Sequence, residues 1–198
     1  HWINGEMISI GDIGKIEKPL IWTLHDMWGI AGAEHYCEDD RALVGYTKEN
    51  RPQSETGFDL NRWTWLRKVK HWKKPILITT PSRWMAEQIS ESALMKGWPV
   101  MAIANPLDTE VWCPIDQSIA REELGLPQNV PLILFGAAGG SVDPRKGFDL
   151  LLKALPLVQE IMSAQGMSSF ELVVFGQDAP KGESDLAKLK IPTHYMGP

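Results

Sequence analysis

The sequence predicts an α/β fold built on parallel sheets, because short apolar runs alternate with helical patterns along the chain. Six runs have strand character, and they fall into two groups of three. A cluster of turn-forming residues, Asn105–Pro114, separates the two groups. We therefore expect two α/β units, residues 1–106 and residues 107–198, and a chain of 198 residues has room for both.

Composition and charge are those of an ordinary globular protein. Hydrophobic residues make up 43% of the chain and charged residues 23%. The net charge of −5 argues against a general nucleic-acid-binding protein. No apolar run approaches the roughly 18 residues of a membrane span, and no secretory signal pattern is present. The two cysteines, Cys37 and Cys113, lie far apart, which favours a reducing, cytoplasmic setting.

The first unit is predicted to hold three buried strands. Each is an apolar run bounded by proline, glycine or polar turn residues: Pro19–Leu24, Pro75–Thr80 and Val100–Ala104. A short helix is expected within Ile8–Ile16, and a longer one from an N-cap at Ser82 to about Met95. Residues 29–60 show little periodicity, which predicts a long loop of the functional or mobile kind.

A histidine and an aspartate directly follow the first predicted strand. Ligands of open α/β sheets gather at the carboxyl ends of the strands. His25 and Asp26 are therefore candidates for proton transfer or for binding a sugar hydroxyl. The alternative is a histidine that only caps its own loop.

Residue types that ligate metals gather a little further along the chain. His35 and Cys37 lie close in sequence to Asp39 and Asp40. Their spacing matches no standard zinc pattern, and the second cysteine pair of such a site is missing. We therefore expect no metal ion here.

The basic segment NRWTWLRKVKHWKK, residues 61–74, is predicted to form an amphipathic helix. Trp65, Val69 and Trp72 fall on one face. Basic side chains without an acidic residue among them occupy the rest: Arg67, Lys68, Lys70 and Lys74. Such a helix can lie on an anionic membrane surface, here the inner face of the membrane. The alternative is an ordinary helix that buries its tryptophan face against its own sheet.

The most informative stretch is PLILFGAAGGSVDPRKGFDLLLKAL in the second unit. A predicted strand, Leu132–Phe135, leads into a loop with Gly139 and Gly140, then into Arg145, Lys146 and a helix. Glycines let a ligand approach the backbone, and a helix start attracts anions. The basic pair adds positive charge suited to phosphate oxygens. This order of strand, glycine loop, basic pair and helix predicts a phosphate or diphosphate site. The alternative is a surface loop with a solvated basic pair. Neither a P-loop nor a dinucleotide fingerprint is present.

The rest of the second unit continues the alternation of strands and helices. Apolar residues recur at helical spacing from Phe148 to Val158. Pro156 lies inside this pattern and is expected to kink or end the helix. Two further strands and two short helices are predicted, over Phe170–Gly176, Thr193–Gly197, Ser118–Leu124 and Asp185–Lys190.

Four segments, in order, carry a resemblance to a known family. They are TLHDMW, TPSRWMAEQ, IANPLDTEVWCP and DPRKGFDLLLKAL, and together they span nearly the whole chain. In this combination the chain resembles the retaining family-4 glycosyltransferases of the GT-B fold, most of all bacterial enzymes of exopolysaccharide and lipopolysaccharide assembly. The resemblance implies two facing Rossmann-like lobes, an N-terminal lobe for the acceptor and a C-terminal lobe for the nucleotide-sugar donor.

The resemblance also implies roles for individual residues. Lys146 and Arg145 hold the donor diphosphate and stabilise it as it departs. Glycines let the donor approach the backbone: Gly139, Gly140, Gly147 and Gly176. His25 and Asp26 lie on the acceptor side, with His25 near the reacting carbon. No metal or other cofactor is implied, because basic residues and a helix dipole take over the charge of the leaving diphosphate.

The chain departs from the family pattern at several points. The glycine loop lacks the arginine that many members carry, and Cys37 alone stands where close relatives have a cysteine cluster. The acidic pair of the family, two glutamates separated by seven residues, normally lies beyond Pro198, and the first glycine loop lies before His1. We therefore expect an internal fragment in which both lobes are incomplete and which is inactive by itself.

The sequence thus predicts a glycosyltransferase that moves a sugar, with retention, from a nucleotide-sugar donor to a hydroxyl of a saccharide or lipid-linked acceptor. Cell-surface polysaccharide biosynthesis is the expected setting. Two alternatives stay open: a non-catalytic module that binds a nucleotide or a membrane, and a GT-B-type nucleotide-sugar epimerase.

Overall fold

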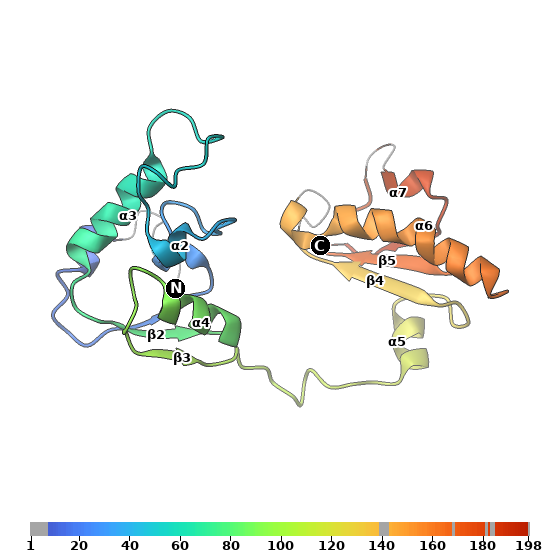
Figure 1. Cartoon of the computed structure of the whole chain (residues 1–198). Coiled ribbons are helices and arrows are strands. Elements are labelled where there is room, and N and C mark those ends of the chain that lie inside the picture. The colour runs from blue at the N-terminus through green and yellow to red at the C-terminus, as the bar shows by residue number, and fades with distance from the viewer. Residues whose placement is uncertain (1–7, 139–142, 168, 181, 183–184, 198) are drawn as a thin grey trace. The chain divides into compact units, whose positions relative to one another are not determined.

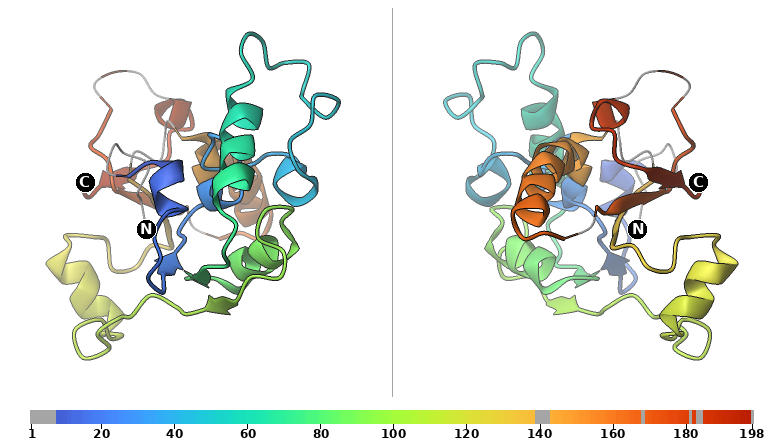
Figure 2. Two further views of the ribbon diagram at one scale, coloured as in Figure 1. Left: turned by 90° about the vertical axis from the view of Figure 1, so that its left-hand side faces the viewer. Right: turned by 90° about the vertical axis from the view of Figure 1, so that its right-hand side faces the viewer.

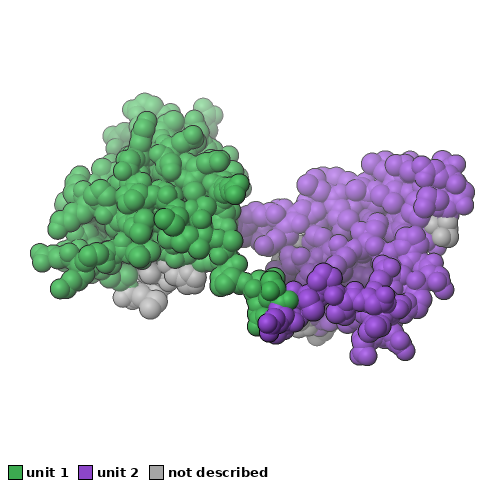
Figure 3. All heavy atoms as spheres, turned by 90° about the horizontal axis from the view of Figure 1, so that it is seen from below, with its two compact units in different colours: residues 1–109 green, residues 110–198 purple. Residues whose placement is uncertain are grey.

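The computed structural model describes residues 8–138, 143–167, 169–180, 182 and 185–197. It shows a mixed α/β chain with two small parallel sheets of three strands each (Figure 1). The predicted α/β class is thereby confirmed. The chain divides into two compact units, residues 1–109 and residues 110–198 (Figure 3), whereas the sequence placed the boundary after residue 106. Each unit has its own hydrophobic core.

The sheet of unit 1 has the order β1-β2-β3, with all neighbours parallel. The strands are β1 (Ile21–Thr23), β2 (Leu77–Thr80) and β3 (Val100–Ala102), and each lies within a predicted run. The helices are α1 (Ile10–Ile13), η1 (Met27–Gly29), α2 (Arg41–Val44), α3 (Leu60–His71) and α4 (Arg83–Glu91). The segment joining α2 and α3 extends beyond the start of α3 (Figure 2).

Side chains at the helix starts account for where two of these helices begin. The hydroxyl of Ser82 accepts the N–H of Met85 at 3.2 Å and caps α4, as predicted. The carboxylate of Asp59 accepts the N–H of Arg62 at 2.9 Å and caps α3. Helix α4 ends at Glu91, earlier than the predicted end near Met95.

Three tryptophans connect the elements of unit 1 at its core. The ring centroid of Trp22 on β1 lies 5.4 Å from that of Trp72 and 6.2 Å from that of Trp28. The indole N–H of Trp72 donates to the carbonyl of Ile10 at 2.9 Å, which ties α1 to the end of α3. Edge-to-face packing of this kind adds about 0.5–1.5 kcal/mol per pair beyond the area buried.

Helix α3 turns its predicted tryptophan face inward. This agrees with the alternative that the helix buries its tryptophans within its own unit. Trp72 is buried, and Trp65 and Val69 are half-buried. The sequence placed Lys68 with the basic residues away from the tryptophan face, but its side chain is 0% exposed. Lys68 lies four residues before Trp72 and shares its stripe of the helix.

The sheet of unit 2 has the order β4-β5-β6, again with all neighbours parallel. Its strands are β4 (Leu132–Gly136), β5 (Glu171–Phe175) and β6 (Thr193–Tyr195). Its helices are α5 (Gln117–Glu123), η2 (Pro144–Lys146), α6 (Phe148–Ala164) and α7 (Asp185–Lys188). Apolar residues of α6 and α7 form one core with Leu172 and Val174 of β5.

Helix α6 continues through Pro156 to Ala164, so of the two effects expected of this proline, a kink or an end, the helix end does not occur. A proline inside a helix costs about 3 kcal/mol. Leu155 is buried in the core, and Leu152 and Val158 pack on that core on either side of the proline. This packing holds the helix together. In the described part of the chain, no helix has both the length and the apolar character needed to cross a membrane.

Candidate functional site

The strands of unit 2 are parallel, so their carboxyl ends lie at the same edge of the sheet. Gly176 follows β5 at this edge with a φ of +82°. A Cβ atom at Gly176 would lie 2.6 Å from the carbonyl oxygen of Ala137, which follows β4. The N–H of Gly176 donates to the carbonyl of Gly197 at 2.7 Å. Glycine at 176 therefore lets the three segments after the strands approach one another closely.

The start of α6 is anchored beside the end of β4. The ring of Phe148 lies 5.2 Å from that of Phe135, centroid to centroid. Gly147 has a φ of +72° and connects η2 to α6 in a left-handed conformation. The predicted ligand glycines Gly139 and Gly140 lie outside the described residues.

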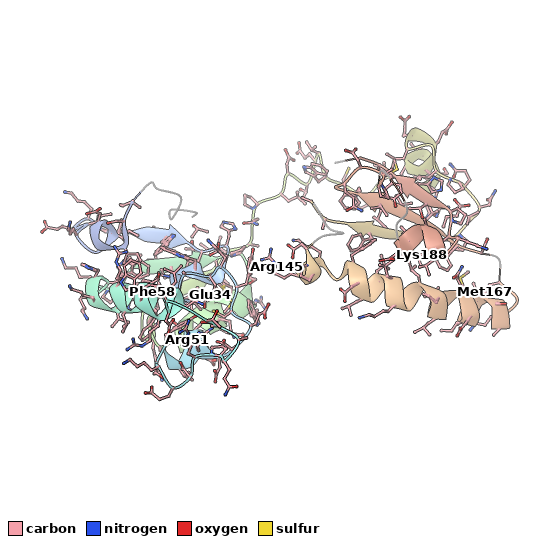
Figure 4. The ribbon with its side chains drawn as sticks, turned by 90° about the horizontal axis from the view of Figure 1, so that it is seen from above. Glu34, Arg51, Phe58, Arg145, Met167 and Lys188 are labelled. Carbon is pink, nitrogen blue, oxygen red and sulfur yellow. The ribbon has the colours of Figure 1, made fainter. Side chains whose placement is uncertain are left out.

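Arg145 is held by an aspartate that precedes it by two residues. Its Nε lies 2.9 Å from Oδ1 of Asp143, and one terminal nitrogen lies 2.7 Å from Oδ2. Asp143 also caps η2 by accepting the N–H of Arg145 at 3.0 Å. The hydrogen bonds from Arg145 lower the pKa of Asp143 to about 2. Figure 4 shows Arg145 at the opposite end of α6 from Met167.

Lys146 is the last residue of η2 and is exposed. Within the described residues, no hydrogen bond or ion pair is found for its ammonium group. Asp143 compensates the charge of Arg145, so the charge of Lys146 remains at the start of α6. A helix start carries amides without intrahelical partners and the positive end of the helix dipole. Of the predicted basic pair, Lys146 is thus the side chain placed to attract an anion.

At the end of β1, the carboxylate of Asp26 pairs with His35, which lies nine residues further along the chain. Oδ2 of Asp26 lies 2.7 Å from Nδ1 of His35, and Oδ1 accepts the N–H of Trp28 at 3.0 Å to cap η1. His25 is exposed and directly follows Leu24 after the strand. Asp26 therefore organises its own loop, and His25 is the candidate for contact with a ligand in unit 1.

Cys37 belongs to a polar cluster with Glu34 and Tyr46. The hydroxyl of Tyr46 donates to a carboxylate oxygen of Glu34 and lies 3.3 Å from the sulfur of Cys37. Burial raises the pKa of Cys37 to about 11. Its thiol therefore stays protonated and unreactive at neutral pH. Among the described residues, no group of three or more histidine, cysteine or acidic side chains is arranged to hold a metal ion.

The long loop of residues 29–60 is ordered by a buried arginine. The side chain of Arg41 donates to Asp39 at 2.9 Å and to Glu55 at 2.6 Å. Its guanidinium also lies 5.0 Å from the ring centroid of Tyr46. These contacts connect residues far apart in the loop and explain how it keeps a defined path with little secondary structure.

The sequence interpretation missed the role of Lys68, which contacts the segment that follows His25 and Asp26. Its ammonium donates to the carbonyls of Trp28, Ala31 and Gly32, with distances of 3.0 Å to Ala31 and 2.7 Å to Gly32. It also lies 3.9 Å from the ring centroid of Trp28. Burial lowers the pKa of Lys68 to about 7, against the opposing effect of Glu34. Lys68 therefore holds the segment that follows His25 and Asp26 onto α3.

Unit 1 is expected to become more stable between pH 7 and pH 9, by about 2 kcal/mol. Lys68 loses its proton near pH 7 in the folded chain but near 10.5 when unfolded, so the unfolded chain binds more protons in this interval. Stability then rises with pH. Above pH 9 the raised pKa of Cys37 acts in the opposite direction, because the folded thiol keeps a proton that the unfolded thiol has lost.

Urea unfolding followed by tryptophan fluorescence measures this rise in unit 1, because Trp112 is the only one of nine tryptophans in residues 110–198. The Lys68→Met variant should show no rise between pH 7 and pH 9. Equal slopes in the variant and in the unchanged chain would show that Lys68 does not titrate in this range.

Comparison with known proteins adds no relative. No family model matches the chain, and searches of curated proteins and of solved structures give no significant match. The resemblance to GT-B glycosyltransferases therefore depends on the four sequence segments. The structure contributes the α/β class, the two parallel sheets and the placement of the candidate residues.

Proposed function

We propose that the protein is a glycosyltransferase of the GT-B fold, which moves a sugar from a nucleotide-sugar donor to a saccharide or lipid-linked hydroxyl with retention of configuration. The observation that carries the proposal is the position of Lys146. Its exposed ammonium lies at the start of α6, beside the carboxyl edge of the β4-β5-β6 sheet. Ligands of open α/β sheets bind outside this edge, and helix starts bind phosphates.

Charge on the donor explains what these groups do. When the bond between the sugar and the diphosphate breaks, negative charge develops on the diphosphate. The ammonium of Lys146 and the first amides of α6 stabilise that charge, and they do so more strongly in the transition state than in the ground state. Asp143 holds the guanidinium of Arg145 with two hydrogen bonds. Gly147 and Gly176 allow the backbone conformations that surround the site.

His25 is the residue of unit 1 that we assign to the reacting region. It is exposed and follows β1 at the carboxyl edge of the β1-β2-β3 sheet. Its imidazole has two ring nitrogens that can donate or accept a hydrogen bond with a sugar hydroxyl. The segment behind it is fixed by Asp26 and by Lys68, so the loop that carries His25 is preorganised.

Calorimetric titration with UDP, GDP and ADP tests the proposal at its donor site. At least one nucleoside diphosphate should bind more than about tenfold more tightly than its nucleoside, because a charge-assisted phosphate contact contributes about 1.5–3 kcal/mol. If no diphosphate binds, the donor site does not exist as described.

Product analysis with labelled nucleotide sugars then separates the enzyme classes. A transferase yields free nucleoside diphosphate and a glycosylated acceptor. An epimerase yields a changed sugar on an intact nucleotide, and a binding module yields neither. Either of the last two results, with diphosphate binding intact, would replace the proposed reaction while keeping the proposed donor site.

A further inference from the structure

The outward side of α3 carries a row of large apolar side chains. Phe58 is 72% exposed, Leu60 51%, Trp63 46% and Leu66 40%. The ring of Phe58 packs edge-on against that of Trp63 with centroids 6.1 Å apart, and Figure 4 shows Phe58 beside this helix. A single exposed apolar residue is ordinary, whereas a contiguous group marks an interaction surface.

Basic side chains share this side of the helix. The guanidinium of Arg67 lies over the ring of Trp63 at 4.6 Å, and Lys70 is exposed one turn beyond Leu66. We name the surface formed by Phe58, Leu60, Trp63, Leu66, Arg67 and Lys70 the apolar–basic face of α3.

The charge of this segment is opposite to that of the chain as a whole. Residues 60–74 contain six basic residues and no acidic residue, in a chain with a net charge of −5. The remaining residues therefore carry −11. Lys68 is buried, which leaves five basic side chains in contact with solvent. A positive segment on an acidic protein gives that one surface an electrostatic preference for anions.

We propose that the apolar–basic face of α3 docks on an anionic lipid surface. Trp63, Leu66 and Phe58 enter the headgroup region, while Arg67 and Lys70 contact lipid phosphates. The combination of tryptophan, leucine and phenylalanine with lysine and arginine is typical of helices that lie in a membrane interface. Long basic side chains can keep their charge at the phosphates while their stems cover apolar surface.

An anionic membrane fits the face better than a protein partner does. The cores of interfaces between proteins are depleted of charged residues, and lysine is among the depleted types. A lipid surface with negative charge attracts each nearby basic residue with about 1 kcal/mol. The sequence suggested that the side of the helix with Trp65, Val69 and Trp72 would contact the membrane. These residues face the interior, so the proposed contact is on the opposite side of α3.

The face is preformed, which makes it suited to direct testing. Lys68 and Trp72 anchor the inward side of α3, and Asp59 caps its start. Substitutions on the outward side therefore leave the core contacts unchanged. The proposal does not depend on the proposed enzymatic function.

Flotation with vesicles of phosphatidylcholine, alone or with 30% phosphatidylglycerol, is the test. The 198-residue chain should float with the anionic vesicles, and binding should weaken as salt is raised. The double variant Arg67→Gln and Lys70→Gln should bind about 25-fold more weakly, since each lost charge changes affinity about fivefold. The double variant Trp63→Ala and Leu66→Asn should bind about tenfold more weakly.

Matched variants elsewhere on the surface provide the controls. Trp84→Ala removes a tryptophan that is 58% exposed on α4, and the pair Lys153→Gln and Lys188→Gln removes two exposed charges from unit 2. Both controls should bind like the unchanged chain. Equal flotation with neutral vesicles, or equal loss in control and test variants, overturns the proposal. Absence of vesicle binding together with self-association that depends on the same face assigns it to a second copy and also overturns the proposal.

Discussion

Replacing Lys146 with alanine is expected to weaken nucleoside-diphosphate binding by at least about tenfold and to slow sugar transfer by about 10²–10³-fold. Lys146 is the side chain of the basic pair that forms no ion pair with a carboxylate among the described residues. Removing it leaves only the helix start and the Asp143-held guanidinium of Arg145 to stabilise the departing diphosphate. The rate should fall more than the affinity, because the charge on the leaving group grows in the transition state.

Lys153 offers a matched control on the same helix. It is exposed on α6 and lies 3.5 Å from Asp149, so Lys153→Ala removes the same charge away from the strand edge. The expected change in diphosphate affinity is small, because exposed charges at a distance are screened. Both variants should unfold within about 0.5 kcal/mol of the unchanged chain, as surface substitutions usually do. Equal diphosphate affinity in Lys146→Ala and Lys153→Ala would contradict the assignment of Lys146.

A substitution at Asp143 provides a second test of the same site. Its carboxylate compensates Arg145, so Asp143→Asn should leave the guanidinium uncompensated and strengthen diphosphate binding. The sequence interpretation placed the diphosphate on Lys146 and also on Arg145. It could not show that Asp143 holds one of these two cations, because that depends on which side chain the carboxylate contacts in the fold.

The strands could be predicted from the sequence because each is a local feature. The runs around Trp22, Ile78 and Val174 are apolar, short and bounded by turn residues, and such runs become buried parallel strands. The N-cap at Ser82 could also be predicted from the sequence, because an N-cap hydrogen bond joins residues only three positions apart. Pro156 does not end its helix, because the packing of Leu155 and its neighbours on the sheet outweighs the local cost of the proline.

The candidate site was less predictable, because its important contacts join residues far apart in the chain. Asp26 is next to His25 in sequence, yet its carboxylate contacts His35. Lys68 reads as one member of a basic run, yet its ammonium reaches carbonyls 36 to 40 residues earlier. The one local signal was its spacing of four residues from Trp72, which places both on the inward stripe.

Lys68→Ala is expected to lower the free energy of unfolding of unit 1 by about 2–5 kcal/mol. The substitution leaves a cavity where a long side chain was fully buried. It also removes the hydrogen bonds to the carbonyls of Trp28, Ala31 and Gly32, and a buried carbonyl without a partner costs about 1–3 kcal/mol. Relief of the buried charge offsets part of this loss, which is why the effect should be larger at pH 9 than at pH 7.

Two further variants separate the reasons for this loss. Lys68→Met keeps most of the volume but not the hydrogen bonds, so it should lose less stability than Lys68→Ala. Lys70→Ala, two residues along and exposed, should stay within about 0.5 kcal/mol of the unchanged chain. Urea unfolding at pH 7 and at pH 9 measures all three. If Lys68→Ala behaves like Lys70→Ala at both values, the buried ammonium does not hold the segment after β1, and the preorganisation of the loop that carries His25 has another cause.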